Sequence, residues 1–169
     1  MDDVSLDVRN AGVVDFLRYR LTSDEQQWPR LAPRFRPVGE VPIDELRVHP
    51  DLIDRLVMLD APMGRRHLRM LMGAAVLVVD SGAIYALAYS QHFLAVRLPA
   101  GARDVLPHGP RRAEADSAAE DPGRQPDARV ALLGAGWTVA DAWKSASLAS
   151  LQLAVGAART AVEGLAPDA

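Results

Sequence analysis

Cysteine is absent from the 169 residues of this chain. Its absence excludes disulfide bonds, thiolate metal ligands and thiol nucleophiles, and makes a reducing compartment the expected location. Long apolar runs are missing as well, because no segment approaches the roughly 20 residues that cross a bilayer. The acidic start, MDDVSLDVRN, lacks the basic region of a signal peptide. We therefore expect a cytoplasmic protein without a membrane partner.

Lysine is scarce, since Lys144 is the one lysine among 19 basic residues and the others are arginines. The acidic residues number 22, which leaves a net charge of −3 and no overall sign of nucleic-acid binding. Hydrophobic residues make up 49% of the chain, which is enough for one core in one domain.

Large hydrophobic residues are missing from one stretch, Pro107 to Arg129, which consists of small, polar and charged residues with proline. Such a stretch cannot bury enough apolar surface to become ordered, so we interpret residues 107–129 as a mobile polar insertion. The expected organisation is an N-terminal helical and proline-rich extension, residues 1–61, that packs on the core. An α+β domain over residues 62–169 contains the insertion.

Three short apolar runs between Gly73 and Pro99 predict an antiparallel meander: GAAVLVVD, AIYALAYS and FLAVRLP. Ser81-Gly82 supplies the first tight turn, because glycine adopts positive φ without strain. The first run is apolar throughout, which predicts a covered central strand or a partner surface. In the third run Leu94, Val96 and Leu98 share one face, whereas Phe93, Ala95 and Arg97 form a mixed opposite face. We expect an α+β fold with a sheet of about four strands, packed on one side by helices.

Helical spacing of apolar residues predicts helices over Asn10–Leu21, from Pro50 onward, and over Ser145–Gly164. A third, short helix is expected from Pro62 to the residue before Leu71. Prolines between Trp28 and Pro42 predict an extended connector with one edge strand. After the insertion, the composition becomes typical of strands again at Val130–Leu133 and Trp137–Val139.

The order of these elements resembles the TfoX N-terminal domain family and the related YjbR-type small domains. The resemblance spans residues 62 to 164 and depends on Leu71-Met72-Gly73, on Asp80-Ser81-Gly82 before Ile84-Tyr85-Ala86-Leu87, and on Phe93 to Pro99 with Arg103, Leu106, Trp137 and Trp143. The basic residue followed by Leu-Pro in that family's third strand matches Arg97-Leu98-Pro99. The resemblance implies a small bacterial domain linked to regulation, with no catalytic residue set to carry over.

A basic cluster is expected at Arg65, Arg66 and Arg69, joined by Arg97. Arginine donates paired hydrogen bonds to phosphates and carboxylates, so the cluster is a candidate for anion, partner or nucleic-acid binding. The interpretation that we favour is a solvated helix face that pairs with Asp60 or Asp54.

Aromatic residues suggest a pocket or an interface, for which the candidates are Tyr85, Tyr89, Trp137 and Trp143. The four histidines, at 49, 67, 92 and 108, lack the spacing of a metal site and are expected at the surface. We therefore expect no metal, no cofactor and no catalytic residues.

The sequence favours a non-catalytic binding or regulatory protein that associates with a protein partner or with itself. Two alternatives remain open at this stage. One is a small enzyme, or a partner of an enzyme, with a pocket lined by Tyr85, Tyr89, Arg97 and Trp137. The other is a nucleic-acid-binding regulator that uses Arg65, Arg66 and Arg69.

Overall fold

The structure is a computed structural model that describes residues 3–21, 33–98, 111–112, 128–143 and 148–165. Its α-helices are α1 (Ala11–Leu21), α2 (Pro50–Leu59), α3 (Gly64–His67) and α4 (Leu148–Glu163). Its 3-10 helices are η1 (Val4–Leu6), η3 (Val38–Glu40), η4 (Ile43–Glu45) and η6 (Ala128–Leu133). Its strands are β1 (Phe35–Arg36), β2 (Leu68–Leu71), β3 (Ala74–Val78), β4 (Ile84–Tyr89), β5 (Phe93–Arg97), β6 (Arg111–Arg112) and β7 (Trp137–Asp141).

The strands form one antiparallel sheet in the order β1-β2-β3-β4-β5-β7-β6. The predicted meander is confirmed as β3, β4 and β5, but the sheet has seven strands rather than about four. The expected third helix is wrong beyond His67, because Leu68–Leu71 forms β2 and pairs along its whole length with β3. Pairing with an apolar central strand outweighs the helical preference of leucine, arginine and methionine.

Two tight turns with positive φ angles connect β2 to β3 and β3 to β4. Met72 and Gly73 connect β2 to β3 with φ angles of 52° and 85°, the left-handed pair that a two-residue hairpin requires. A Cβ at position 73 would lie 2.5 Å from the Glu45 carbonyl oxygen, so glycine is needed there for space as well. The predicted turn at Gly82 is confirmed, with a φ of 96°.

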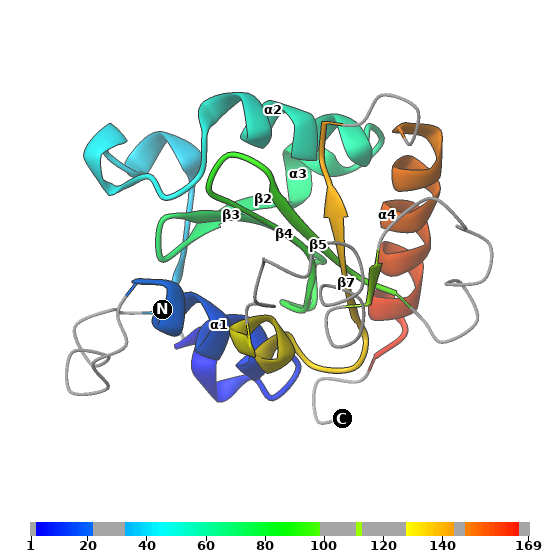
Figure 1. The fold of residues 1–169 in the computed structure, drawn as a ribbon, viewed down its shortest axis with the longest axis horizontal. Coiled ribbons are helices and arrows are strands. Elements are labelled where there is room, and N and C mark those ends of the chain that lie inside the picture. The colour runs from blue at the N-terminus through cyan, green and yellow to red at the C-terminus, as the bar shows by residue number, and fades with distance from the viewer. Residues whose placement is uncertain (1–2, 22–32, 99–110, 113–127, 144–147, 166–169) are drawn as a thin grey trace, which may run out of the picture.

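Helices cover both faces of the sheet, so the expectation of helices on one side is wrong (Figure 1). One core lies between the sheet and the helices α2 and α4, and it includes Leu56, Leu94 and Val155. The other lies between the sheet and α1 with η6, and it includes Phe16 and Val76. All five residues of β3 are buried, as the apolar first run predicted for a covered central strand.

The N-terminal segment is attached to the β3–β4 turn by side-chain hydrogen bonds. Asn10 Nδ2 donates to the Gly82 carbonyl oxygen at 2.8 Å, and Asn10 Oδ1 accepts from the Ile84 amide at 2.9 Å. Arg9 donates to the Ser81 hydroxyl at 3.1 Å and to the Ser81 carbonyl oxygen at 2.8 Å. These bonds position α1 over its face of the sheet.

Part of the region after the meander has a different structure from the one that the sequence predicts. Residues 107–110 and 113–127 of the predicted insertion lie outside the described residues, whereas Arg111–Arg112 pairs with β7 as β6. Val130–Leu133, expected to resemble a strand, belongs to η6 and packs beside α1. The predicted C-terminal helix is confirmed as α4, and Ser145 to Ser147 lie outside the described residues.

Candidate interaction surface

The predicted basic residues do not form one cluster. Arg65, Arg66 and Arg69 are exposed on α3 and β2, whereas Arg97 is half-buried on β5, which β3 and β4 separate from β2. Arg97 donates to the Arg9 carbonyl oxygen at 2.9 Å. Burial is the main cause that lowers the Arg97 pKa, and the nearby Arg9 charge lowers it further.

Two of the exposed arginines are engaged within the chain. Arg66 pairs with Asp80 at 2.7 Å, so the expected pairing with Asp60 or Asp54 is wrong. Arg69 donates to the carbonyl oxygens of Arg66 at 2.9 Å and Leu68 at 2.7 Å. These contacts reduce the number of donors that the arginines could offer to a phosphate.

The predicted aromatic residues are divided between the two faces of the sheet. Tyr85 lies in the core beneath α2 and α4, whereas Trp137 and Tyr89 belong to the core beneath α1. Trp143 is 40% exposed, and its indole donates to the Gln91 carbonyl oxygen at 2.7 Å. A single pocket lined by Tyr85, Tyr89, Arg97 and Trp137 is therefore not formed.

A bulge explains why Tyr85 faces the α2 and α4 side. Leu77 pairs with Ala86 and Val78 pairs with Ile84, so Tyr85 is the extra residue of β4. A bulge interrupts the strict alternation of faces. Tyr85 and Ala86 consequently both contribute to the same core.

A buried polar network surrounds Tyr85, and no residue spacing in the sequence indicated it. The Tyr85 hydroxyl donates to Asp60 Oδ2 at 2.7 Å and contacts His67 Nδ1 at 2.9 Å. Arg159 Nε of α4 lies 3.0 Å from the same Asp60 oxygen, as an ion pair rather than an aligned hydrogen bond. His67 is 2% exposed and Asp60 is likewise 2% exposed, so the expectation of a surface histidine is wrong at position 67.

The electrostatics of this network follow from its burial. Burial lowers the His67 pKa, and the nearby Asp80 and Asp60 charges oppose that shift. Burial, followed by the hydrogen bond to Asp60, raises the Tyr85 pKa far above its usual range. Because the Tyr85 hydroxyl donates its own proton to Asp60, a hydrogen bond between Tyr85 and His67 requires the His67 tautomer with a proton on Nδ1. The network links α2, α3, β4 and α4, and its enclosed side chains serve the fold rather than a substrate.

The other histidines that the structure describes are exposed. His49 caps α2 by accepting from the Asp51 amide at 3.2 Å, and His92 lies in the β4–β5 turn. His108 lies outside the described residues. Within the described part of the chain, no three His, Asp or Glu side chains gather as a metal site would require.

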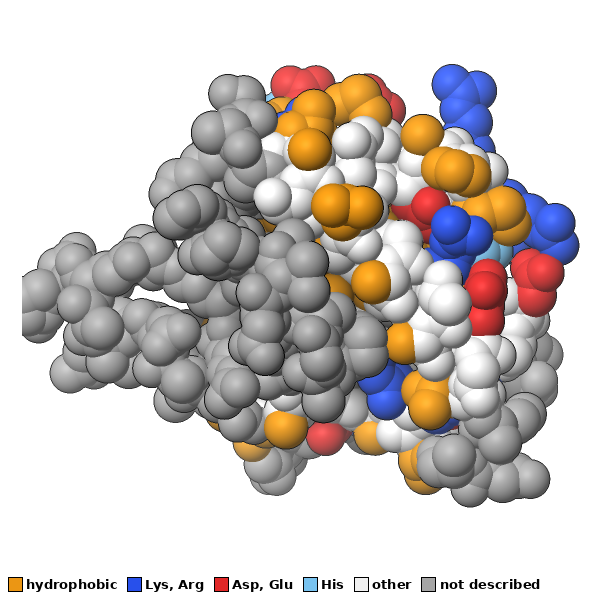
Figure 2. Space-filling model, turned by 90° about the vertical axis from the view of Figure 1, so that its right-hand side faces the viewer, with side chains coloured by type: hydrophobic (Ala, Val, Ile, Leu, Met, Phe, Trp, Pro, Cys, Tyr) orange, Lys and Arg blue, Asp and Glu red, His pale blue; other side chains and the backbone are white. Residues whose placement is uncertain are grey.

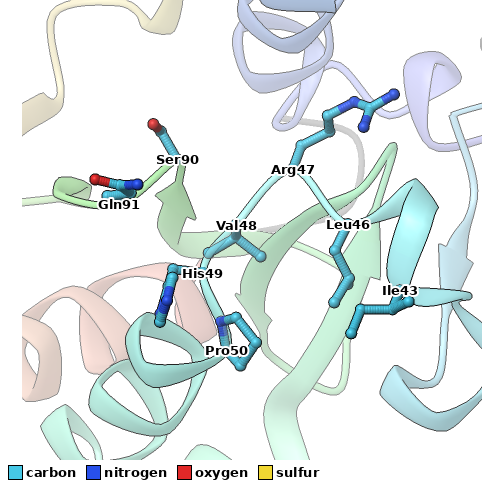
Figure 3. Close-up of a pocket in the computed structure, with 8 residues that line it drawn as sticks. All are labelled: Ile43, Leu46, Arg47, Val48, His49, Pro50, Ser90 and Gln91. Atoms are coloured by element: carbon cyan, nitrogen blue, oxygen red, sulfur yellow. The ribbon is translucent and has the colours of Figure 1, made fainter.

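A shallow depression of about 330 Å³ lies where the segment before α2 meets Ser90 and Gln91 (Figure 3). Ile43, Leu46 and Val48 contribute apolar lining. The backbone of Ser90 is already paired, because its amide donates to Arg47 O at 2.7 Å and its carbonyl accepts from His49 N at 2.9 Å. Figure 3 shows that the Arg47 guanidinium and the Ser90 hydroxyl point in different directions. The Arg47 guanidinium and the Ser90 hydroxyl therefore do not converge on one point of the depression, as groups that orient a small molecule would.

The outward side of α4 offers a different kind of surface. Ala149, Leu153, Gly156 and Thr160 follow one another at spacings of three and four, so they lie on one side of the helix. We call these four residues the α4 face. It is opposite the buried stripe, which consists of Leu151, Ala154, Val155, Ala158 and Val162.

The four residues of the α4 face are uncharged and partly apolar, and exposed Glu163, three residues after Thr160, borders the face at the end of the helix. Leu153 is 68% exposed, whereas the Thr160 hydroxyl donates to Gly156 O at 3.1 Å and is thereby directed to its own helix. Figure 2, which turns the α4 side of the molecule to the viewer, shows hydrophobic side chains scattered among uncharged atoms across the middle of the coloured part, with charged side chains at the right and others at the top and bottom. Next to this face, Gln152 Nε2 contacts Met58 O of α2 at 3.4 Å, and Met58 is 46% exposed.

Among the described residues, no side chain packs into the space that a Cβ at Gly156 would occupy. A Cβ there would meet nothing within 4 Å outside its own helix turn, and its φ is not positive. Glycine in a helix interior costs about 1 kcal/mol relative to alanine. A gap beside an exposed leucine leaves room for the side chain of a docked protein.

Comparisons with protein-family models, with curated proteins and with solved structures found no match. Among the helices of the described residues, none is both long enough and apolar enough to span a membrane.

Proposed function

We propose that this chain is a non-catalytic binding protein that docks another protein chain on the α4 face. One observation carries the proposal: a 68% exposed leucine, Leu153, lies beside a helical glycine, Gly156, whose absent Cβ no described residue outside the helix would contact. Exposed large apolar side chains on an uncharged surface favour association, because docking removes them from water.

The distribution of polar groups supports binding over catalysis. Asp60, His67 and Tyr85 are titratable side chains in mutual contact, yet each is at most 2% exposed. A substrate needs access to the groups that transform it. The network is better suited to holding α4 in place, because Arg159 of α4 pairs with Asp60 at 3.0 Å.

Nucleic-acid binding has weaker support. Arg66 and Arg69 donate to groups of the chain itself, and Arg97 lies three strands from β2. Strong duplex binding uses about 6 to 10 phosphate contacts, more than this region offers. A cytoplasmic location and kinship with the TfoX N-terminal domain family are compatible with a docking role and stay predictions.

Site-specific photo-cross-linking tests the proposal. A photoreactive amino acid replaces Leu153 in the native host, and Ile43 is the matched control because it is an 81% exposed hydrophobic residue before α2. We expect a protein adduct from position 153, none from position 43, and loss of the adduct when Gly156→Arg is added. Equal labelling from both positions, or no adduct from position 153, would contradict docking on the α4 face.

A further inference from the structure

We infer that the occupant of the α4 face is a second copy of this chain, with the two α4 helices antiparallel and crossing at Gly156. This inference rests on the proposed function and commits it to one partner. It is drawn from the order of residues on the face and from the charges at the two ends of the helix.

The α4 face is complementary to itself. Leu153 projects beside the gap at Gly156, so a two-fold axis near Gly156 places Leu153 of each copy against Gly156 and Thr160 of the other. Two-fold contacts require one patch to match its own copy in this way. Gly156 lies at the middle of the 16-residue helix, so an axis there uses the full length of the face.

The charges of α4 favour the antiparallel arrangement over the parallel one. Glu163 is the last residue of α4, and the first turn of the helix has no acidic residue. In an antiparallel pair each Glu163 approaches the amino end of the other α4, where the helix dipole favours negative charge. In a parallel pair the two Glu163 carboxylates would face each other. Arg159, the other charged residue of α4, is already paired with Asp60.

One helix face is small for a stable interface, since such interfaces bury about 1,200 to 2,000 Å². The Met58 carbonyl oxygen of α2 contacts the Gln152 side chain of α4 at 3.4 Å, so α2 lies beside this face and could add contact area. We therefore expect reversible association that depends on protein concentration.

The lack of cysteine allows a direct test, because each introduced cysteine is the only thiol of its chain. Disulfides form only where the two Cα atoms approach to about 4.4 to 6.8 Å. Gly156→Cys should form a disulfide-linked dimer by itself, because the axis passes at that position. Ala149→Cys should not, because seven residues on either side of the axis separate the two copies of residue 149 by roughly 21 Å.

A mixed experiment determines the direction of the helices. Residues 149 and 163 are equally far from residue 156, so Ala149→Cys and Glu163→Cys chains should cross-link when mixed and not when oxidised separately. Ile43→Cys is the exposed control and should give no dimer. Self-linking of Ala149→Cys would overturn the antiparallel arrangement, and association without a disulfide at position 156 would overturn the α4 pairing.

Sedimentation equilibrium of the unmodified full chain separates this inference from the proposed function. We expect the mass to rise from 18.3 kDa toward twice that value between low micromolar and high micromolar concentrations. A constant mass of 18.3 kDa would overturn self-pairing. In that case, an adduct from Leu153 to a different protein would still support docking on the α4 face, and its absence would remove both.

Discussion

Removing one hydroxyl from the buried network gives a quantitative prediction for the fold. Tyr85→Phe keeps the aromatic ring, which is 0% exposed, and deletes the group that joins Asp60 to His67. The ring volume is nearly conserved, so the substitution leaves no large cavity. The loss is therefore almost purely a loss of hydrogen bonds.

The size of the stability loss depends on Asp60 and His67, which lose their hydrogen-bond partner. A hydrogen bond to a charged group contributes about 1.5 to 3 kcal/mol, and His67 Nδ1 would also lose its acceptor inside the core. We expect the free energy of unfolding to fall by about 2 to 4 kcal/mol. For a domain of this size, such a change lowers the Tm by roughly 5 to 12 °C.

Urea unfolding and thermal melting measure this change. Tyr89→Phe is the matched control, because Tyr89 is half-buried and contacts Phe16 through its ring, with centroids 6.4 Å apart. The control should change the free energy of unfolding by less than about 0.5 kcal/mol. If both variants unfold at the wild-type urea concentration, the network does not stabilise the fold and the reasoning is refuted.

Two further variants test the pH dependence of stability and the contribution of Gly156 to the stability of α4. Burial lowers the His67 pKa below 6.5, so the unfolded chain binds the proton more readily and wild-type stability falls as the pH drops from 6.5 toward the folded-state pKa. His67→Gln should remove that part of the slope in thermal melts between pH 5 and 8, and an unchanged slope would contradict the assignment. Gly156→Ala should raise the free energy of unfolding by up to about 1 kcal/mol in dilute solution, because its Cβ enters open space. A lower Tm for this variant would mean that the chain itself needs the glycine.

The meander could be predicted because its local signals agree with its tertiary contacts. The alternation of Leu94 and Val96 matches the core beneath α2 and α4, and Gly82 adopts the positive φ that its turn suggested. β2 could not be predicted in the same way, because Leu68–Leu71 lacks β-branched residues and becomes a strand by pairing with β3. The apolar pattern of β3 indicated cover on both faces, yet the sequence does not say which helix lies on which face.

The buried network around Tyr85 could not be predicted from the sequence either, because it also depends on tertiary contacts. Asp60 follows α2, His67 ends α3 and Tyr85 lies in β4, and no spacing rule relates an aspartate after one helix to a tyrosine at a strand bulge. The α4 face was partly predictable, since its residues recur with the same period as the buried stripe. Their exposure depends on which stripe the sheet covers.

Self-association of two surface variants tests the central claim that the α4 face is the docking surface. Leu153→Glu and Ile43→Glu each replace an exposed hydrophobic residue, 68% and 81% exposed respectively. Each copy contributes one Leu153 to a two-fold contact, and burying a leucine yields about 1.5 to 3 kcal/mol, so Leu153→Glu should weaken dimerisation at least about 100-fold. Sedimentation equilibrium should show Leu153→Glu at 18.3 kDa under conditions where the wild type and Ile43→Glu approach twice that mass. Equal association of all three chains would contradict the account.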